Sequence, residues 1–510
     1  MKRILFLLVT VFVMTATHAQ DISDGLLYSN EDITQGTARF QALSGAFGAL
    51  GGDYSAVNLN PAGSAIFTGS GISATLLIHD RDNTANYFGT SAQSIGTDAD
   101  IAQLSGVFVF NNPSEEAIFK KFAIILMYEQ TQNFDNDLLI QGTSNASIAD
   151  FFLTQAQGIP LDLLQLQNGE TVSDLYNFLG ENEGVDAQNA FLGYQAFIID
   201  PVTDDPGNTQ YFSNVDDGSF QQEYNYTTRG NNSKYTANVA TQIKDNLFIG
   251  VNLNSHIIDY DQSTFLFERN SNGGSINQIG FENNLSVRGS GFSAQIGAIF
   301  KYQNLRLGAS LQSPTWFEIS EETTQSLQSR RDDSSQSIIE TIAPNVINVF
   351  PDYQLRTPGK ATASIAYIFG KSGLISFDYS YKDYSQIEFD SDINGFGNST
   401  NTFSDLNNAI ENTLKGVSTF RLGGEYRISL LTLRGGLRYS ESPYEDENVL
   451  GDLNGFSAGL GYNFGNYNID LAYSRAEQDR AQRLNNIGFN NAASVNTVYS
   501  NYVLTFSFIF

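Results

Sequence analysis

The chain has 510 residues, no cysteine and a formal net charge of −28 at pH 7. This acidic balance disfavours nucleic acid as a partner, because nucleic-acid binding needs a basic face. Without cysteine there are no disulfides, thiolate metal sites, catalytic cysteines or haem-attachment motifs. Glycine and the aromatic residues phenylalanine and tyrosine are abundant, whereas tryptophan occurs once. This composition indicates β-structure with polar loops.

Residues 1–19 predict a secretory signal peptide. A basic start (Lys2, Arg3) precedes an apolar run, and a small-residue cleavage site ends at Ala19. A membrane anchor is the alternative, but the run is too short to cross a bilayer. The mature chain is expected to begin at Gln20. No later run of 18 apolar residues occurs, so no membrane helix is expected.

The rest of the chain alternates between apolar and polar residues with the period of a β-strand. In the C-terminal segment, Tyr502, Leu504 and Phe506 alternate with polar Thr505 and Ser507. Charged residues recur opposite aromatic ones in many segments, which fits a wet barrel lumen better than a soluble sandwich. We therefore predict an all-β fold, a transmembrane antiparallel β-barrel of about 14 strands. The expected strands lie near 70–80, 101–110, 119–131, 232–243, 246–260, 285–300, 304–318, 360–370, 373–388, 416–428, 430–441, 454–464, 466–476 and 497–510.

The lengths of the connections support the barrel. Short links such as Lys244-Asp245 and Gly465 alternate with links expected to be long and polar. This pattern is typical of periplasmic turns and external loops, and an even strand count returns both termini to the periplasm. The longest external loop spans 133–221 and contains helix-like pieces at 148–166 and 173–179. It is either a lid packed on itself or an apolar groove that collects a greasy substrate.

Residues 20–69 precede the first strand and predict a segment inside the barrel, which we call a hatch. Its stretch 36–63 mixes large apolar residues with glycines, so a short helical turn is possible but a long helix is not expected. It ends in Asn60-Pro61-Ala62, a turn signal. The expected domains are therefore a signal peptide (1–19), a hatch (20–69) and a barrel (70–510).

This stretch resembles the N-terminal hatch of the FadL-type family of outer-membrane transporters for long-chain fatty acids and other hydrophobic compounds. The resemblance rests on Asn60-Pro61-Ala62-Gly63 after a small-residue run, and on later segments at 305–310 with 313–314, 358–367, 374–384, 420–426, 433–436 with 442–443, and 469–473. It implies a barrel of fourteen strands closed by the hatch, with substrate leaving sideways into the membrane. The family's capture groove is usually built from the third and fourth external loops, whereas the helix-bearing loop here is the second.

The resemblance implies passive uptake of hydrophobic molecules such as long-chain fatty acids through a Gram-negative outer membrane, gated by the hatch. A fatty acid needs an apolar slot and a cation for its carboxylate. Inward-facing arginines could hold the head group, and hatch side chains could cover the tail. In the alternative, the arginines pair with Glu425, Asp378 and Asp470 as a charge lattice that braces the barrel. The candidate substrate-binding residues are Phe40, Leu43, Phe47, Leu50, Arg421, Arg434 and Arg438.

Two further functions stay open, a general porin and a cargo-binding component of a secretion system. An enzyme is not expected, since His79 and His256 lie in no nucleophile motif. The acidic loop turns match no calcium-binding pattern, so no metal is expected. No phosphate-binding loop occurs, and no cofactor is implied. The expected partners are a hydrophobic substrate, membrane lipid and, because Phe510 resembles an insertion signal, the barrel-assembly machinery. We expect a monomer.

Overall fold

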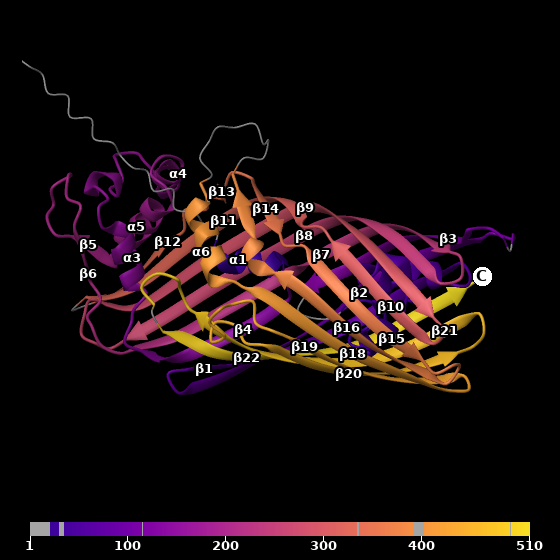
Figure 1. Ribbon diagram of the computed structural model, residues 1–510. Helices are drawn as coiled ribbons and strands as arrows, with labels where there is room; N and C mark the ends of the chain where they lie inside the picture. Colours follow the sequence, from indigo (N-terminus) through magenta and orange to yellow (C-terminus); the bar gives the residue numbers. More distant parts are fainter. Residues whose placement is uncertain (1–20, 30–34, 115, 334–335, 392–401, 490) are drawn as a thin grey trace, which may run out of the picture.

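The computed structural model describes residues 21–29 and 35–510, apart from residues 115, 334–335, 392–401 and 490. The expected signal peptide and Gln20 lie outside the described residues. Most of the described chain is β-strand, and the strands form one barrel with helices at one end and inside it (Figure 1).

The barrel wall is a closed antiparallel sheet with fourteen positions, which confirms the predicted fold class. Neighbours pair in chain order, and β22 closes the ring by pairing with β1, from Gly71 with Ile509 to Asn86 with Ser494. The wall strands are β1 (Gly71–Tyr87), β2 (Thr90–Asn111), β3 (Phe119–Asn133) with β4 (Asn136–Ser144), β7 (Phe220–Ile243), β8 (Leu247–Asn270), β9 (Ile276–Tyr302), β10 (Leu305–Gln312) with β11 (Thr315–Asp333), β14 (Tyr353–Thr357) with β15 (Lys360–Ile368), β16 (Gly373–Asp383) with β17 (Glu388–Asp390), β18 (Gly416–Ile428), β19 (Leu431–Ser440), β20 (Leu453–Asn463), β21 (Tyr467–Arg483) and β22 (Ala492–Ile509).

One end of the barrel, the turn end, carries the short connections that the sequence predicts. Lys244, Gln303 and Ser429 adopt positive φ angles of 51°, 54° and 56° there, the left-handed conformation that tight antiparallel hairpins need. The C-terminus lies at this end (Figure 1). The opposite end, the loop end, carries the helices and the longer connections.

The first connection at the loop end differs from the prediction. Residues 81–100 were expected to form a long polar loop, but they extend β1 and β2 into a hairpin that turns at Phe88 and Gly89. The side chains of this extension are mostly polar, so no apolar alternation marks it as a strand. Strand β7 spans Phe220–Ile243 without a break and includes the strand expected near 232–243.

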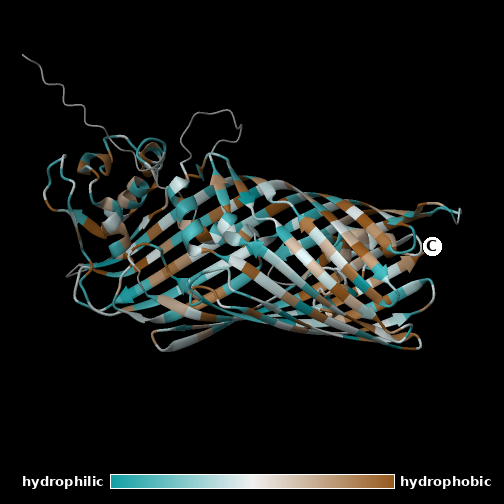
Figure 2. Cartoon of the chain, in the orientation of Figure 1, coloured by the Kyte–Doolittle hydropathy of each residue, from teal (hydrophilic) through white to brown (hydrophobic). Residues whose placement is uncertain are grey.

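The outward side chains form an apolar band bordered by aromatic belts. Brown and teal residues alternate along the strands in Figure 2, as in a wall with lipid on one side and a polar lumen on the other. Tyr302, Tyr426 and Phe464 are exposed near the turn end, and Tyr439 and Tyr502 are exposed at the other border of the band. Such belts mark the membrane interfaces of β-barrels. In the described part of the chain, no helix is long and apolar enough to cross a membrane.

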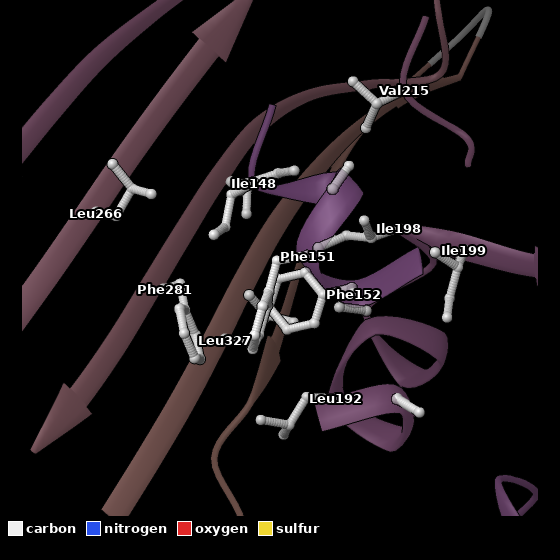
Figure 3. Close-up of a cluster of buried hydrophobic side chains, with 14 of the residues drawn as sticks. Ile148, Phe151, Phe152, Leu192, Ile198, Ile199, Val215, Leu266, Phe281 and Leu327 are labelled. Carbon is white, nitrogen blue, oxygen red and sulfur yellow. The ribbon is translucent and has the colours of Figure 1, made fainter. Parts of the chain in front are cut away.

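The second loop folds into a small helical domain at the loop end. It contains the short strands β5 (Ile199–Pro201) and β6 (Tyr211–Ser213) besides its helices. In Figure 3 the rings of Phe151 and Phe152 lie beside Phe281 of β9, at 5.8 and 5.3 Å between centroids. The domain is therefore packed on the strand extensions as a folded unit. Its helices are α3 (Ala149–Ala156), the 3₁₀ turn η3 (Leu161–Leu163), α4 (Val172–Asn182) and α5 (Val185–Gln195).

Other connections add smaller elements at the same end. The fourth loop contains β12 (Gln336–Ile342) and β13 (Asn348–Val349), and the fifth contains η4 (Tyr384–Gln386) and α6 (Ser404–Thr413). The N-terminal segment contributes α1 (Ile22–Ser29), α2 (Ala38–Ala42), η1 (Ser55–Asn58) and η2 (Pro61–Ile66). These four elements pack against the inner side of the wall and form the plug of the barrel.

Candidate functional site

Within the segment predicted as the hatch (20–69), residues 36–67 form a compact set of turns inside the barrel. From here on, the name hatch refers to residues 36–67 alone, and helix α1 is described separately. Helix α2 starts at Thr37, whose side chain accepts a hydrogen bond from the Phe40 amide, and it lasts five residues. Gly45, Gly51 and Gly52 then take positive φ angles of 78°, 60° and 67°. These conformations strain any residue with a side chain, so the glycines allow the reversals that end the helix. The predicted short helical turn is confirmed.

The hatch backbone lies directly against glycines of the barrel wall. A Cβ atom added to Gly436 of β19 would come within 2.5 Å of the Leu43 carbonyl carbon, and one on Gly459 of β20 would come as close to the Ala42 Cβ. Both approaches are shorter than real Cβ contacts. The wall is therefore shaped to the hatch, since a side chain at such positions would displace it. The other wall glycines in such contact are Gly250, Gly297, Gly308 and Gly423.

Side-chain amides and hydroxyls of the wall satisfy the carbonyl groups of the second half of the hatch. Asn252 donates to the Val57 carbonyl at 2.8 Å, and Asn238 donates to the Pro61 carbonyl at 2.9 Å. A buried carbonyl without such a partner would cost about 1–3 kcal/mol. Gln295 and Ser310 both donate to the Leu59 carbonyl. The polar lumen thus provides the partner for the hatch backbone.

Asn60 fixes the turn that the sequence marks as Asn60-Pro61-Ala62. Its side-chain nitrogen Nδ2 donates to the Gly48 carbonyl at 2.7 Å and to the Ala298 carbonyl of β9 at 3.0 Å. Its side-chain oxygen accepts from the Ala62 amide at 3.1 Å and caps η2. One side chain therefore joins the two halves of the hatch to the wall.

An ionic network connects the other half of the hatch to the wall. Glu425 of β18 accepts from Arg39 of α2 and from Arg434 of β19, both at 2.9 Å, and from Arg427 at 2.6 Å. Arg434 also donates to Asp470 of β21 at 2.6 Å. Burial opposes the charge of Arg39, but Glu425 and Asp53 outweigh this effect and raise its pKa. Arg39 of the hatch therefore binds Glu425, a carboxylate that Arg427 and Arg434 of the wall also hold in place.

The three candidate head-group arginines lie on the neighbouring strands β18 and β19, where Arg421 pairs in register with Arg438. Arg434 takes part in the contacts with Glu425 and Asp470 that the charge-lattice interpretation expects. Arg421 donates to Ser380 at 2.9 Å and is 9% exposed. Arg438 borders a small pocket with Gln41 of the hatch. Arg421 and Arg438 are therefore cross-strand neighbours, and Arg434 takes part in the network around Glu425.

The four candidate apolar residues of the hatch pack among themselves and against the wall. Leu43 and Phe47 are fully buried, and Leu50 is 2% exposed. Phe40 is partly buried and lies 5.4 Å from Phe47 between ring centroids. In the described arrangement these side chains stabilise the hatch, and covering a ligand tail would need the hatch to move.

A cluster of packed apolar side chains lies in the lumen towards the loop end and was not predicted from the sequence. We call this region the upper chamber. Helix α1 packs into it through Leu26 and Tyr28, which are 5% and 3% exposed. Gly25 lies so close to Ile387 and Phe389 that a Cβ there would be within 3 Å of both side chains. The wall and loop residues of the chamber are mostly aromatic or aliphatic: Phe134, Ile258, Tyr260, Phe317, Tyr353, Phe389 and Phe403.

Polar groups fix α1 within this chamber. Gln132 of β3 donates to the Leu27 carbonyl at 2.9 Å, and Lys382 of β16 donates to the Ser29 carbonyl. Asp24 lies on the same helix, where burial and the nearby Asp21 and Glu321 carboxylates raise its pKa well above the usual range. The position of Asp24 in the docked helix therefore disfavours the charged form of its carboxyl group.

The wall has a seam between β2 and the strand pair β3 and β4. The ladder between β2 and β3 covers only Gln103–Asn111 and Lys121–Glu129. Within the described chain, residues 90–101 of β2 pair with β1 alone, and β4 pairs with β7. Register shifts that leave Ala102 and Thr131 unmatched flank the point where pairing stops. The segment Ala123 to Tyr128, in which the sequence indicates no bulge, remains regular.

Side chains bridge this seam where backbone pairing ends. Asn133 donates to Asp100 at 2.8 Å, and Ser94 donates to the Asp137 carbonyl at 2.8 Å. The next residue, Phe134, belongs to the upper chamber. The seam therefore adjoins the apolar part of the lumen and is closed by contacts that can open without breaking a sheet.

His79 and His256 lie in the wall, on β1 and β8. His256 Nε2 is 2.9 Å from Ser293 Oγ, and its ring packs edge-on against Phe317. Ser293 is fully buried and also accepts from Asn254 at 3.2 Å. His79 lies 4.0 Å from Asp100 beside the seam. No group of three or more His, Asp or Glu residues suited to a metal ion occurs among the residues described.

Comparison with solved structures identifies the architecture. The chain is similar in structure to a FadL homologue of Pseudomonas aeruginosa, with a TM-score of 0.52 at 13% sequence identity, covering 94% of this chain and 99% of the other. The chain has the FadL-type fold. The Pseudomonas putida toluene transporter TodX matches with a TM-score of 0.50 at 14% identity, again covering 94% of this chain and 99% of the other. No protein-family model matches the sequence. No curated protein matches it either.

Proposed function

We propose that this chain is a channel of a Gram-negative outer membrane through which hydrophobic molecules diffuse passively. The observation that carries the proposal is the upper chamber, an aromatic and aliphatic region of the lumen towards the loop end. A lumen that conducts only water and ions does not need such a region, because burying apolar surface favours apolar occupants. A hydrophobic cargo would use it as a binding site.

Helix α1 occupies this chamber and marks its chemistry. Its apolar side chains Ile22, Leu26 and Leu27 pack where a hydrophobic ligand would lie. A ligand would replace them at small net cost, because one set of apolar contacts is exchanged for another. Passage through the chamber then requires α1 to shift or leave.

The hatch and the seam complete the proposed route. The hatch fits the wall glycines closely, which supports its role as a barrier to polar solutes on the way to the turn end. An open porin would not need such a barrier. The seam adjoins the chamber at Phe134 and has no backbone ladder to break. A hydrophobic molecule would leave sideways through it into the membrane, and the hatch would gate the remaining path.

Uptake by whole cells tests the proposal. Cells that produce the protein should take up labelled oleate or toluene saturably, while uptake of a labelled pentose stays at the level of cells without it. Replacing Ile258, a chamber residue with 1% exposure, by Asn should lower uptake about tenfold, since it places an amide among apolar groups. The matched control is Val202→Asn on the exposed surface of the helical domain.

Folding of each variant is checked by its shift in electrophoretic mobility on heating. Pentose uptake as fast as that of oleate would identify a porin and refute the proposal. So would unchanged hydrophobic uptake in a folded Ile258→Asn barrel.

A preference for fatty acids is a finer part of the proposal and depends on a head-group cation. The candidate cations are Arg421, Arg434 and Arg438, and Arg434 contacts two carboxylates. Oleate uptake by Arg421→Ala, Arg434→Ala and Arg438→Ala should separate them, with toluene as the uncharged control. If oleate uptake is unchanged in all three, none of them is the head-group site.

A further inference from the structure

The outer surface of β16 to β21 contains a groove of about 500 Å³ that faces the membrane. Outward side chains form its walls: Phe377 on β16, Phe420 on β18, Leu437 and Tyr439 on β19, and Phe456 on β20. A volume of this size is typical of small-molecule sites, which span roughly 300–1,000 Å³. The groove is therefore large enough to hold part of a lipid.

A second groove of about 760 Å³ lies beside it, over β20, β21, β22, β1 and β2. Leu76, Leu460 and Leu504 are among its outward residues, and almost all its lining is apolar. The rings of Phe456 and Tyr473, 6.2 Å apart between centroids, form the ridge between the two grooves. The membrane-facing surface thus has two adjacent apolar grooves, which suits an occupant with several acyl chains.

Arg475 borders the first groove at the level where the apolar band ends. It follows Tyr473 by two residues on the outward side of β21 and pairs in register with Phe456 and Ser500. Tyr473 and Tyr502 pack at 5.2 Å between centroids and belong to the aromatic belt. Since such belts lie at the membrane interface, the Arg475 guanidinium is at the level of the lipid head groups.

Arg475 differs from Arg288 and Arg356, which are also exposed towards the loop end. Arg288 pairs with Asp259 and Asp261, and Arg356 pairs with Glu388. Within the described residues, the guanidinium of Arg475 has neither an ion pair nor a hydrogen bond. Its neighbour on the same face, Glu477, accepts from Asn496 at 3.0 Å. In a chain with a net charge of −28, an unpaired cation beside two acyl-sized grooves calls for an anionic partner.

We propose that this surface binds a phosphorylated, multi-acyl glycolipid of the lipid A type from the outer leaflet. Its acyl chains occupy the two grooves, and one phosphate binds the Arg475 guanidinium, which matches phosphate geometry in bidentate fashion. The inference requires the outer-membrane location and is independent of what the lumen transports. It assigns the outer face of β16, β18–β22 and β1–β2 to lipid recognition, and the second groove reaches Asp100, which also takes part in the seam contact with Asn133.

Native mass spectrometry of the purified barrel in detergent tests the site, with bisphosphorylated hexa-acyl lipid A as the probe. Wild type should bind the lipid, and Arg475→Ala should weaken the apparent Kd at least about tenfold, the worth of a charge-assisted hydrogen bond. Arg288→Ala, an arginine whose partners lie on its own surface, is the matched control and should bind like wild type. Leu437→Trp should also weaken binding, because it fills the first groove.

The lipid probe itself provides a second arm. Lipid A with both phosphates removed should bind wild type no better than the intact lipid binds Arg475→Ala. Equal binding of intact lipid by Arg475→Ala and wild type would overturn the proposal, as would equal binding of the two lipids by wild type. Oleate that binds in an Arg475-dependent way, while lipid A does not, would reassign the surface to a fatty acid.

Discussion

At the scale of single residues, Arg39 is the contact through which the hatch reaches the charged part of the lumen. Its ion pair with Glu425 is 2.9 Å long, and Glu425 is 1% exposed in its side chain. Arg427 and Arg434 hold the same carboxylate from the wall, so Glu425 stays paired when Arg39 is removed. The hatch can therefore be loosened here without leaving a bare charge in the barrel.

Replacing Arg39 by Ala should weaken hatch docking by about 1.5–3 kcal/mol, the usual contribution of a hydrogen bond to a charged group. Small sugars should then enter proteoliposomes faster, as measured by swelling rates. Arg427→Ala removes a bond to the same Glu425 but none to the hatch, so its swelling rate should match that of wild type. Equal rates in all three proteins would mean that this ion pair does not hold the hatch.

Asp24 gives the docking of α1 a dependence on pH. The raised pKa of Asp24, due first to burial and then to Asp21 and Glu321, means that docking takes up a proton. Docking is then favoured at acid pH and weakens as pH rises from the ordinary Asp value of about 4 through the raised pKa.

Hydrogen exchange of residues 22–29 in wild type and Asp24→Asn should reveal this dependence. The ratio of the two rates at each pH cancels the intrinsic effect of pH on exchange. Wild type should lose protection relative to Asp24→Asn as pH rises from about 4 to 8. A ratio that stays constant over this range would show that Asp24 does not control the helix.

At the scale of elements, the fit between the hatch and the wall depends on the absence of side chains. Gly435 and Gly436 are neighbours on β19, but only Gly436 faces the hatch. A Cβ on Gly436 would meet Leu43 and Ser44 backbone atoms at 2.5 and 2.7 Å, whereas one on Gly435 would meet the Ser457 carbonyl at an ordinary 3.7 Å. The pair provides an internal control within one strand.

Gly436→Ala should therefore destabilise the docked hatch by about 1–3 kcal/mol, the range found for overpacked sites. Protease cleavage within residues 36–67 should become faster in this variant and stay at the wild-type rate in Gly435→Ala. If both variants resist cleavage like wild type, the wall can adapt and the close fit is not required.

The elements also show what the sequence can and cannot reveal. Strands within the apolar band were predictable, because lipid on one side and a polar lumen on the other impose a period of two. The extension over 81–100 is not surrounded by lipid and lacks that period. Helix α5 is buried on most sides, so no amphipathic pattern marks it. Helix α1 is only eight residues long and depends on the chamber, which is built from distant strands.

The same limit applies to the candidate site. Asn60-Pro61-Ala62 was recognisable as a turn because Asn and Pro have local conformational preferences. The partners of Arg434 were only one of two open interpretations, since both Glu425 and Asp470 come from other strands. The contacts between the wall glycines and the hatch could not be predicted from the sequence. A glycine in a strand can indicate that another part of the chain comes close, but not which part.

At the scale of the whole molecule, the proposed function assigns two tasks to two different places. The plug blocks the lumen to polar solutes, and the seam provides the exit for a hydrophobic molecule. The hatch fills the lumen towards the turn end with many backbone contacts, while the loop end holds a chamber with a small occupant. The barrel stays closed as a sheet below the seam and relies on side-chain contacts at it. Under the proposed function, a molecule would leave the chamber sideways through the seam without unfolding the wall or removing the hatch.

Cross-linking tests this route, and the absence of natural cysteine makes introduced thiols unique. Asp100→Cys with Asn133→Cys places thiols on two side chains now 2.8 Å apart across the seam. A short thiol cross-linker should then abolish hydrophobic uptake, and reduction of a cleavable linker should restore it. The control pair, Ser105→Cys with Met127→Cys, links residues already joined by the β2–β3 ladder and should leave uptake unchanged. Uptake that survives a complete seam cross-link would place the exit elsewhere, whereas equal loss in both pairs would indicate a general stiffening of the wall.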